Sequence, residues 1–465
     1  MVKKGQIVEL TIESAAFEGS TVARHNDLVV FVRKAVPGDR LLAKIRRKRR
    51  RHAEASVEEI LDPSPHRVEP RCRHFESCGG CTWQNYRYDQ QLASKQQQVT
   101  DLFERIGDLE SFEVRPTIPS PESFYYRNKM EFTFGASRWL TREEIASGQA
   151  LERGFALGLH IPKRFDKILD LEECHLQSPR SAELVNFFRR LALDNGWSAY
   201  DSRSHIGYLR NLVIRTGTRT GELLVNLVTS RSEPQRMEQI CSELLKAFPE
   251  TTTFINSVND THSPVAAGKE TVLHGEGFIH DQIGERRFRI GATTFFQPNT
   301  LQAEKLFSVA REMAGLKGDE TVYDLYCGIG AISLFLSDSA ALVAGFDHHE
   351  QSIQDAAVNS QSNGVKNCRF FAMDAREALR PGVTRELGLP QLVVLDPPRV
   401  GLHKDVCQAV LQSSVPRLVY ISCNPATQAR DLKILSPRYS IRAVQPVDMF
   451  PQTYHIENVV LLEAR

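Results

Sequence analysis

The feature that most constrains the fold is the regular alternation of strands and helices that begins near residue 298. Its apolar, strand-like runs are separated by helical segments and cover residues 321–326, 341–346, 391–395 and 417–422. This alternation is typical of a doubly wound parallel α/β sheet. Ligands of such sheets bind at the carboxyl ends of the strands, so we expect a cofactor site in the first half of this region.

The first of these runs ends in a glycine loop, Tyr326-Cys327-Gly328-Ile329-Gly330. Two glycines let the backbone approach a ligand closely, but Ser333 replaces the third glycine of the dinucleotide fingerprint, which argues against NAD. Asp347 ends the second run, 19 residues after Gly328, where a carboxylate can bind ribose hydroxyls. A nucleoside without a pyrophosphate fits this pattern, and S-adenosyl-L-methionine is the leading candidate.

Two further carboxylates follow strand-like runs. Asp374 comes after residues 368–371 and could bind an adenine amino group, although a solvated helix cap is the alternative. Asp396 begins the sequence Asp396-Pro397-Pro398-Arg399 at the end of an apolar strand. The two prolines fix the backbone there, and such a rigid platform beside a flipped base is typical of methyltransferases that act on nucleobases.

Cys423 is the candidate nucleophile. It follows the apolar run 418–421 and precedes Asn424-Pro425, which predicts a turn, so its thiol should lie where the chain leaves the sheet. A lone cysteine beside a strand is more often a small buried apolar residue. Cys327 is the competitor, but inside the glycine loop it is better placed to pack than to attack.

Composition bounds the class of protein. A chain of 465 residues is too long for one core, and 41% hydrophobic with 25% charged residues is typical of a soluble globular protein. No apolar leader or long apolar run is present, so we expect a cytoplasmic protein without membrane contact. Nine cysteines in this context favour thiols, metal binding or catalysis over disulfides. A net charge of +1 says little about partners.

The N-terminal region is expected to be a small β-barrel. Residues 5 to about 62 contain short apolar strands separated by turn signals at Gly19 and Pro37-Gly38-Asp39. Within this region, residues 44–51 read Lys-Ile-Arg-Arg-Lys-Arg-Arg-Arg. A solvated sheet edge would explain this basic run, but clustered cations repel one another unless an anion meets them, which favours nucleic acid.

Three cysteines lie close together in the next region, at Cys72, Cys78 and Cys81. They can converge on one metal, and Cys174 is the nearest candidate for a fourth ligand, although His74 or His175 could replace it. Four thiolates suit zinc or an iron-sulfur cluster, and the spacing does not separate the two. Buried thiols without a metal are the alternative.

The middle of the chain alternates hairpins with helices, which predicts an α+β domain. Helical periodicity covers residues 83–106, 181–194 and 234–247, and hairpin signals occur near 217–221 and 281–285. The strand 125–134 interleaves aromatic with basic side chains, which suits RNA but also fits an ordinary amphipathic strand. We expect domains at 1–62, 63–290 and 291–465.

Taken together, these segments resemble the RNA (uracil-5-)-methyltransferases, bacterial enzymes that make 5-methyluridine in 23S ribosomal RNA and in tRNA. The resemblance covers essentially the whole chain and also includes Phe295-Phe296-Gln297-Pro298-Asn299 and Asp448-Met449-Phe450-Pro451. It implies an RNA-binding TRAM barrel of OB-like fold, a central RNA-binding α+β domain with an iron-sulfur site, and a C-terminal Rossmann-like domain that binds S-adenosylmethionine.

The same resemblance implies particular sites. A [4Fe-4S] cluster would be held by Cys72, Cys78, Cys81 and Cys174, and the cofactor would contact Gln297, Tyr326, Asp347, Asp374 and Asp396. The sequence departs from the family pattern at Ala331, where an asparagine is frequent, and at Asp347, where a glutamate is usual. Ala331 removes one polar contact, whereas Asp347 keeps the charge.

The resemblance also implies a mechanism. Carbon-5 of uracil is a poor nucleophile, so the Cys423 thiolate adds to carbon-6 and moves electron density to carbon-5. Glu457 occupies the position of the base that later removes the carbon-5 proton, and His455 is the rival from its ordinary pKa. We expect a monomer acting on RNA, with 23S ribosomal RNA favoured and tRNA open.

Two other functions were weighed against this one. RNA cytosine-5 methyltransferases usually carry a cysteine just after the Asp-Pro-Pro platform, where this chain has Arg399 and Val400, so uracil is favoured. An inactive RNA-binding scaffold is opposed by the presence of Cys423, Glu457, Asp396 and the glycine loop.

Overall fold

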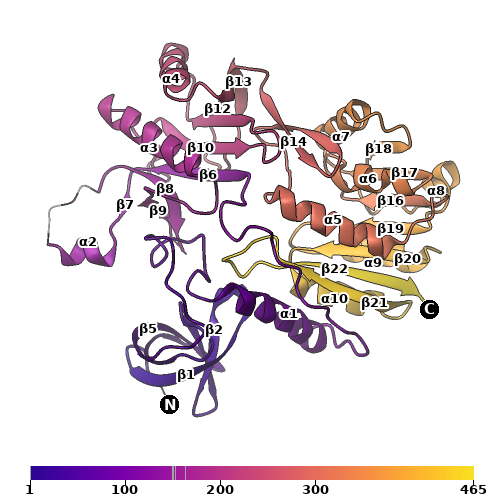
Figure 1. Ribbon diagram of the computed structural model, residues 1–465, viewed down its shortest axis with the longest axis horizontal. Coiled ribbons are helices and arrows are strands. Elements are labelled where there is room, and N and C mark those ends of the chain that lie inside the picture. The colour runs from indigo at the N-terminus through magenta and orange to yellow at the C-terminus, as the bar shows by residue number, and fades with distance from the viewer. Residues whose placement is uncertain (1, 149–150, 152, 163) are drawn as a thin grey trace. The chain divides into compact units, whose positions relative to one another are not determined.

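The computed structural model describes residues 2–148, 151, 153–162 and 164–465 (Figure 1). The chain forms two compact units, each built from discontinuous segments. The first unit comprises Met1–Arg71, Thr82–Ser123 and Gln302–Arg465, and the second comprises Cys72–Cys81 and Phe124–Leu301. The division at 1–62, 63–290 and 291–465 stays a prediction. Within the described part of the chain, no helix is both long and apolar enough to cross a lipid bilayer.

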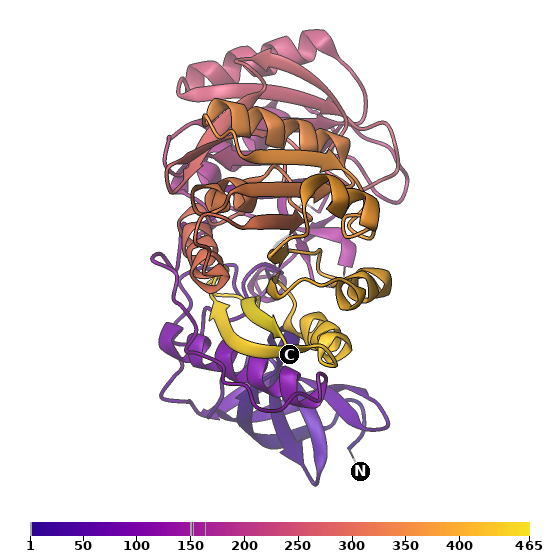
Figure 2. The same cartoon turned by 90° about the vertical axis from the view of Figure 1, so that its right-hand side faces the viewer.

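Five strands at the start of the first unit close into a barrel in the order β1-β2-β3-β5-β4 (indigo in Figure 2). Their bounds are β1 (Ile7–Ala15), β2 (Thr21–His25), β3 (Leu28–Arg33), β4 (Arg40–Lys48) and β5 (His52–Asp62), with the short 3-10 helix η1 (Phe17–Gly19) after β1. Side chains alternate across a strand, so Val8, Leu10 and Ile12 of β1 point into the barrel core. The barrel predicted from the sequence is confirmed.

The second part of the first unit is a seven-stranded sheet in the order β18-β17-β16-β19-β20-β22-β21. Its strands are β16 (Thr321–Leu325), β17 (Leu342–Asp347), β18 (Cys368–Ala372), β19 (Leu392–Leu395), β20 (Arg417–Ser422), β21 (Tyr439–Val447) and β22 (Glu457–Ala464). Strands β16 to β20 are parallel, as predicted. Strand β22 is antiparallel to both β20 and β21, which the sequence reasoning did not anticipate.

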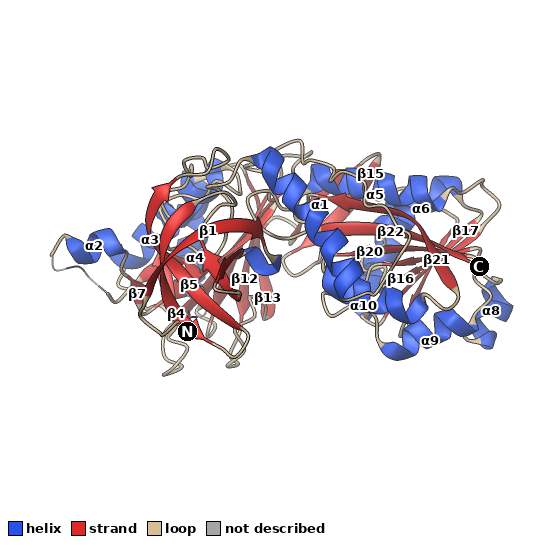
Figure 3. Ribbon diagram, turned by 90° about the horizontal axis from the view of Figure 1, so that it is seen from below, coloured by secondary structure: helices blue, strands red, loops and turns tan. Residues whose placement is uncertain are grey.

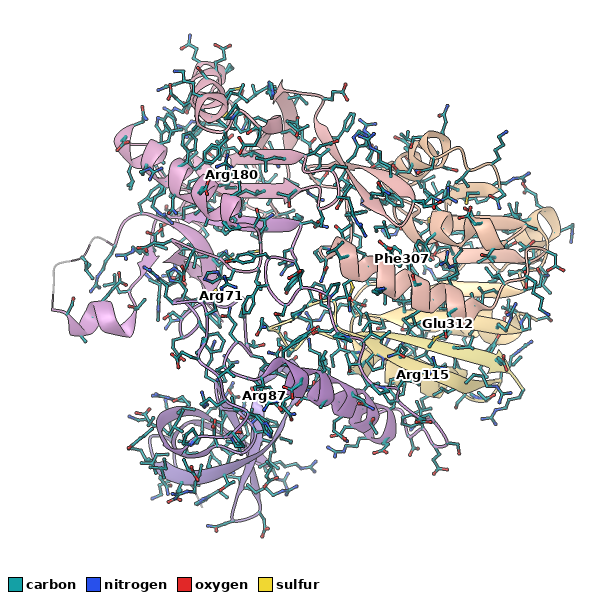
Figure 4. All side chains as sticks on the ribbon, in the orientation of Figure 1. Arg71, Arg87, Arg115, Arg180, Phe307 and Glu312 are labelled. Carbon is teal, nitrogen blue, oxygen red and sulfur yellow. The ribbon has the colours of Figure 1, made fainter. Side chains whose placement is uncertain are left out.

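Helices cover both faces of this sheet, with α5 and α6 on one side and α9 and α10 on the other (Figure 3). Burial on both faces explains why strand residues such as those of Leu392–Leu395 are almost all apolar. The helices are α1 (Tyr88–Arg105), α5 (Thr300–Ala314), α6 (Ala331–Leu336), α7 (Glu350–Ser362), α8 (Pro381–Leu387), α9 (Lys404–Gln412) and α10 (Pro425–Leu435), with η2 (Ser337–Ser339) after α6. On α5, Phe307 is buried and Glu312 is exposed (Figure 4).

The second unit is built on an eight-stranded sheet in the order β13-β12-β11-β10-β6-β8-β9-β7 and a two-stranded hairpin, β14-β15. Its strands are β6 (Lys129–Gly135), β7 (Arg138–Trp139), β8 (Ala156–Ile161), β9 (Arg164–Asp170), β10 (Leu209–Thr216), β11 (Leu223–Thr229), β12 (Thr251–Val258), β13 (Lys269–His274), β14 (Phe278–Ile283) and β15 (Arg286–Gly291). Its helices are α2 (Arg142–Ala146), α3 (Pro179–Asp194) and α4 (Pro234–Ala247). The predicted helices near 181 and 234 and the hairpins near 217 and 281 are confirmed.

Candidate functional site

Cys423 and Glu457 lie at facing ends of two neighbouring antiparallel strands. Ser422, the last residue of β20, pairs with Asn458 of β22. Cys423 follows Ser422 and Glu457 precedes Asn458, so the same register brings the thiol and the carboxyl opposite each other. The two residues that the sequence reasoning assigned to nucleophile and base are therefore neighbours at one edge of the sheet.

A buried pair of amides fixes this juxtaposition. Gln428 on α10 donates to the carbonyl of Tyr420 in β20 at 2.9 Å and to that of Asn458 in β22 at 3.3 Å. The Asn458 side chain donates back to Gln428 Oε1 at 2.8 Å. Both amide side chains are fully buried, where a lost hydrogen bond is expensive. The helix after Cys423 is thereby tied to both strands that carry the candidate site.

The turn at Cys423 has its own cap. Asn424 is the N-cap of α10, and its Oδ1 accepts from the Ala426 N–H at 3.1 Å, a role for which asparagine is well suited. Its amide nitrogen donates to the carbonyl of Arg399 at 3.1 Å. The predicted Asn-Pro turn is thus also a direct link to the Asp396-Pro397-Pro398-Arg399 segment.

Asp396 joins the same site from the neighbouring parallel strand. Leu395 of β19 pairs with Tyr420 of β20 on one side and with Leu325 of β16 on the other. Asp396 directly follows Leu395 and Tyr326 directly follows Leu325, so both also lie at this edge of the sheet. In β16, Asp324 is fully buried and accepts a 2.6 Å hydrogen bond from the Ser333 hydroxyl.

The acidic groups of the site raise one another's pKa. Burial, together with the Glu457 and Asp396 carboxyls, raises the pKa of the Cys423 thiol to about 12, whereas the Arg399 guanidinium acts in the opposite direction. Burial, then the charge of Asp324, raises the pKa of Asp396 to about 7. Burial and Asp396 also raise the pKa of Glu457 well above its ordinary value. Cys423 is thus a thiol at rest, and the Arg399 guanidinium is a neighbour that favours the thiolate.

Arg399 and Tyr454 were not singled out as site residues from the sequence. The Arg399 guanidinium donates a hydrogen bond to the Tyr454 hydroxyl, which, with the charges of Cys423 and Glu18, raises the pKa of Arg399. Tyr454 also packs against Val36, Trp83 and Tyr86 near the barrel. Arg399 had a signal in the sequence, as a cation directly after the platform prolines, but Tyr454 had none because its partners are distant in the chain.

A cavity of about 640 Å³ opens beside these strand ends. It is lined in part by Tyr326, Asp347, Asp374 and Pro398. Asp347 accepts hydrogen bonds from the N–H groups of Gly328 and His349 at 3.1 and 2.9 Å, so it already braces the glycine loop. The size and the carboxylate lining fit a nucleoside-containing cofactor.

Asp374 is more constrained than the sequence suggested. Arg376 contacts its carboxylate through Nε at 2.8 Å and Nη2 at 2.7 Å, and this pairing lowers the pKa of Asp374 to about 2. Asp374 therefore carries a negative charge at the cavity wall throughout the physiological pH range. An incoming amino group would share this carboxylate with Arg376.

The glycine loop requires glycine at position 330 for a steric reason. Gly330 has a φ of 78°, and a Cβ there would lie 2.9 Å from the Phe370 ring. Glycine is therefore required both by the left-handed backbone and by the close approach of β18. Ser333, which breaks the dinucleotide fingerprint, instead holds Asp324.

The remaining predicted residues belong to the second compact unit. Gln297 is buried, and its backbone carbonyl accepts from the Asn128 amide at 2.8 Å. Burial raises the pKa of the Cys72 thiol to about 11, with Cys78 and Cys174 adding to it, so three of the four cysteines lie within electrostatic range. Across the residues that the structure describes, however, no three His, Cys, Asp or Glu side chains are arranged to hold a metal ion. The expected ligand cage is not assembled.

The chain matches two family models and several known proteins. The model of the tRNA (Uracil-5-)-methyltransferase family matches residues 218–465, and that of the TRAM domain matches residues 2–57. The chain is 42% identical over 457 residues to an uncharacterized RNA methyltransferase of Bacteroides thetaiotaomicron, which covers 97% of this chain and 100% of that protein. An uncharacterized RNA methyltransferase of Chlorobaculum tepidum is 40% identical over 473 residues, covering 99% and 97%.

Among solved structures, the chain is similar to the Pyrococcus abyssi tRNA (uracil-54, C5)-methyltransferase in complex with S-adenosyl-L-homocysteine. The TM-score is 0.76 at 27% sequence identity, and the match covers 98% of this chain and 100% of that one.

Proposed function

The chain belongs to the tRNA (uracil-5-)-methyltransferase family, and on that basis we propose that it methylates carbon-5 of a specific uridine in RNA through a covalent bond between Cys423 and the uracil ring. Members of this class are S-adenosylmethionine-dependent RNA methyltransferases. The observation that carries the proposal is the convergence of Cys423, Glu457 and Asp396 at the ends of three adjacent strands, beside a cavity of about 640 Å³.

The residues then take the following roles. The Cys423 thiolate adds to carbon-6, and the ring electrons that leave the C5–C6 double bond make carbon-5 nucleophilic. S-adenosylmethionine supplies the sulfonium methyl group that carbon-5 takes up. Glu457 then removes the carbon-5 proton, and the electron pair of that C–H bond restores the double bond and expels the thiolate. Asp396, close to both groups, is placed to hydrogen-bond the uracil ring.

The raised pKa of Glu457 is consistent with its role as base. A carboxylate that is poorly solvated and lies near a second carboxyl binds a proton more tightly, so it is a stronger acceptor for carbon-bound hydrogen. His455, the rival, packs against Tyr454 with ring centroids 4.2 Å apart and the ring planes tilted by 34°.

For the cofactor, Tyr326, Asp347 and Asp374 line the cavity, and Pro398, two residues after Asp396, also lines it. Gln297 belongs to the other compact unit and is proposed as a contact from the resemblance alone. The [4Fe-4S] cluster on Cys72, Cys78, Cys81 and Cys174 also rests on the resemblance. Iron and sulfide analysis of protein purified without oxygen tests it, and a colourless, zinc-containing protein would refute it.

The most specific part of the proposal is which RNA is the substrate. The cysteine set favours 23S ribosomal RNA through the resemblance, whereas the Pyrococcus abyssi neighbour acts on tRNA. Since that neighbour aligns with 98% of this chain, a TRAM barrel alone does not separate the two substrates.

The test is to incubate the full chain with methyl-labelled S-adenosylmethionine and separate ribosomal RNA and tRNA prepared from cells that lack the gene. Labelled RNA is digested to nucleosides and the modified position is mapped. We expect 5-methyluridine at one position of one RNA. Label in 5-methylcytosine, or no label in either RNA, would contradict the proposal.

A further inference from the structure

The eight-stranded sheet of the second unit has two different faces. Phe132 of β6 and Leu212 and Ile214 of β10 pack in one apolar cluster with residues of α3 and α4. Side chains of opposite parity, such as Thr133 and Asn211, lie on the other face because the strand period is two. That second face carries a cavity of about 560 Å³, formed with the loops that follow α3 and β12. We call it the sheet-face pocket; its polar and aromatic lining includes Thr133, His160, Lys167, Tyr200, Arg210 and Asn211.

Arg210 gives this pocket a fixed positive charge. It is 5% exposed, and its guanidinium donates to the carbonyls of Asn259 and Thr261 at 2.6 Å and of Ser263 at 2.5 Å. Within the described ranges, no carboxylate lies within salt-bridge distance of it. Backbone carbonyls satisfy its hydrogen bonds but not its net charge, so the buried cation favours an anionic ligand in the pocket.

The other charges in the pocket are largely neutralised by one another. Arg203 forms an ion pair with Asp166 at 2.6 Å, and Asp201 accepts from the N–H groups of Arg203 and Ser204. Lys167 donates to the Ser137 hydroxyl. The pocket lining therefore holds three cations against two carboxylates, Asp166 and Asp201.

An aromatic ring and an amide complete the wall. The Tyr200 ring lies over the Arg210 guanidinium, with 4.2 Å between the ring centroid and Cζ, and its hydroxyl pairs with His205 Nδ1 at 3.0 Å. Asn211 is 8% exposed, and its amide nitrogen donates to the Thr133 hydroxyl at 3.3 Å. Asn211 lines the cavity with its amide group, which can offer a donor and an acceptor to a ligand.

These groups are complementary to a small ligand that carries a negative charge, a flat ring and hydrogen-bonding groups on the edge of that ring. A ribonucleotide has all three, and an amide beside an aromatic ring is the usual means of binding an unstacked base. An acidic peptide would satisfy Arg210 but would make no use of the Tyr200 ring in the wall. The volume lies in the range of ordinary ligand sites.

We propose that the sheet-face pocket binds one unstacked nucleotide of the RNA substrate, with its phosphate toward Arg210 and Lys167 and its base between Tyr200 and Asn211. This rests on the proposed function, since it takes the RNA to be the ligand. The pocket would hold a nucleotide other than the one that is methylated, because Cys423 is not among the residues that line it.

The test compares Tyr200→Ala and Asn211→Ala in the full chain with a matched control, Gln239→Ala, on the helix α4 that covers the opposite face. We expect each pocket variant to raise the KM for RNA and the Kd for a fluorescent single-stranded RNA by about five-fold or more, since one base stack is worth about 1–3 kcal/mol. The kcat and the melting temperature should stay unchanged, and the control should match the unmodified chain. Arg210 is left intact because replacing it would remove its hydrogen bonds to three backbone carbonyls and could destabilise the loop that they belong to.

Two further experiments distinguish binding of RNA from binding of free nucleotides or phosphate, and failure of the pocket proposal from failure of the proposed methylation. AMP, UMP and inorganic phosphate are titrated into the chain by calorimetry, and 4-thiouridine RNA is photocrosslinked and the labelled peptide sequenced. Crosslinks to Tyr200 or its neighbours support the assignment. Unchanged KM and Kd in both variants would overturn the pocket while leaving uridine methylation standing, and nucleotide binding without any effect on RNA affinity would overturn the assignment to RNA. The Kd and crosslinking arms decide the matter even if no methylation is detected.

Discussion

Cys423 is held between two carboxyls that disfavour its thiolate and one guanidinium that favours it. With the thiol pKa raised to about 12, the thiolate is a minor species at neutral pH, and only the thiolate attacks. Substrate binding has to change this balance. The Arg399 guanidinium, fixed by Tyr454, is the group in the site best placed to stabilise the charge as it forms.

Alkylation of Cys423 measures this balance directly. In the unmodified chain we expect the iodoacetamide rate at Cys423 to rise about ten-fold per pH unit from pH 7 to 9.5 without a plateau, because the pKa lies above that range. Asp396→Asn removes a charge that raises the pKa, so its alkylation should be faster at each pH. Arg399→Gln removes the opposing charge and should be slower. Peptide mass spectrometry reads the site. A plateau near pH 8.5, or equal rates in both variants, would contradict the electrostatic assignment.

Separate substitutions of the nucleophile and the base should fail at different steps. Cys423→Ala removes the sulfur that is proposed to bond carbon-6, so methylation should fall by at least about 10³-fold with no protein-RNA adduct. Glu457→Gln keeps the shape of the proposed base but cannot take a proton from carbon-5, so the methylated adduct should accumulate and migrate with RNA on a denaturing gel. Asn458 is next to Glu457, but its side chain contacts Gln428 rather than the site. Asn458→Asp therefore shows how much activity is lost through structural disturbance alone. Normal turnover by Glu457→Gln would remove it from the role of base.

At the scale of elements, the sequence predicted what local pattern determines. The strands β16 to β20, the glycine loop and the turn at Cys423 follow from apolar runs with glycine and proline at their ends, and the structure has them where they were predicted. The register that places Glu457 opposite Cys423 depends on the antiparallel insertion of β22 between β20 and β21, which no local pattern signals. Glu457 was therefore identified by resemblance, and Tyr454 was missed.

Helix α1 has a role that its polar sequence concealed. Lys95 is fully buried and pairs with the equally buried Asp448 at 2.6 Å, and it also donates to the Phe450 carbonyl at 3.2 Å. Gln91 on the same helix exchanges two 3.0 Å hydrogen bonds with Gln452. These contacts hold the loop 448–456, which leads through Tyr454 to Glu457.

Breaking this buried pair should be costly, and removing both partners less so. Lys95→Met leaves the Asp448 carboxylate buried without its cation, and we expect the free energy of unfolding to fall by about 3–5 kcal/mol. Lys95→Met combined with Asp448→Leu should recover part of that loss, because no uncompensated charge remains. Urea unfolding followed by tryptophan fluorescence measures both. A loss below about 1 kcal/mol for Lys95→Met would mean that the pair contributes little to holding the loop.

At the scale of the whole molecule, the net charge of +1 conceals a strongly basic edge of the barrel. Arg46 in β4 forms an ion pair with Glu58, with 2.9 Å between Nη2 and Oε1. In contrast, Arg47, Arg49 and Arg50 are exposed, and in the part of the chain that the structure describes no carboxylate lies within 4 Å of them. Unpaired guanidinium groups on a TRAM barrel are suited to RNA phosphates, and those three are therefore better targets than the whole basic run.

Salt dependence distinguishes an RNA-binding edge from a merely solvated one. Each phosphate contact with single-stranded nucleic acid contributes about −0.7 to the slope of log K against log salt concentration. Replacing Arg47, Arg49 and Arg50 with Gln should therefore weaken RNA binding at low salt and flatten the slope by up to about 2, whichever RNA is used. The control replaces Lys366, Arg369 and Arg385, three exposed cations around β18, and removes the same charge. If both triple variants lose affinity and slope equally, the effect is one of total charge, and the barrel edge is not a specific RNA contact.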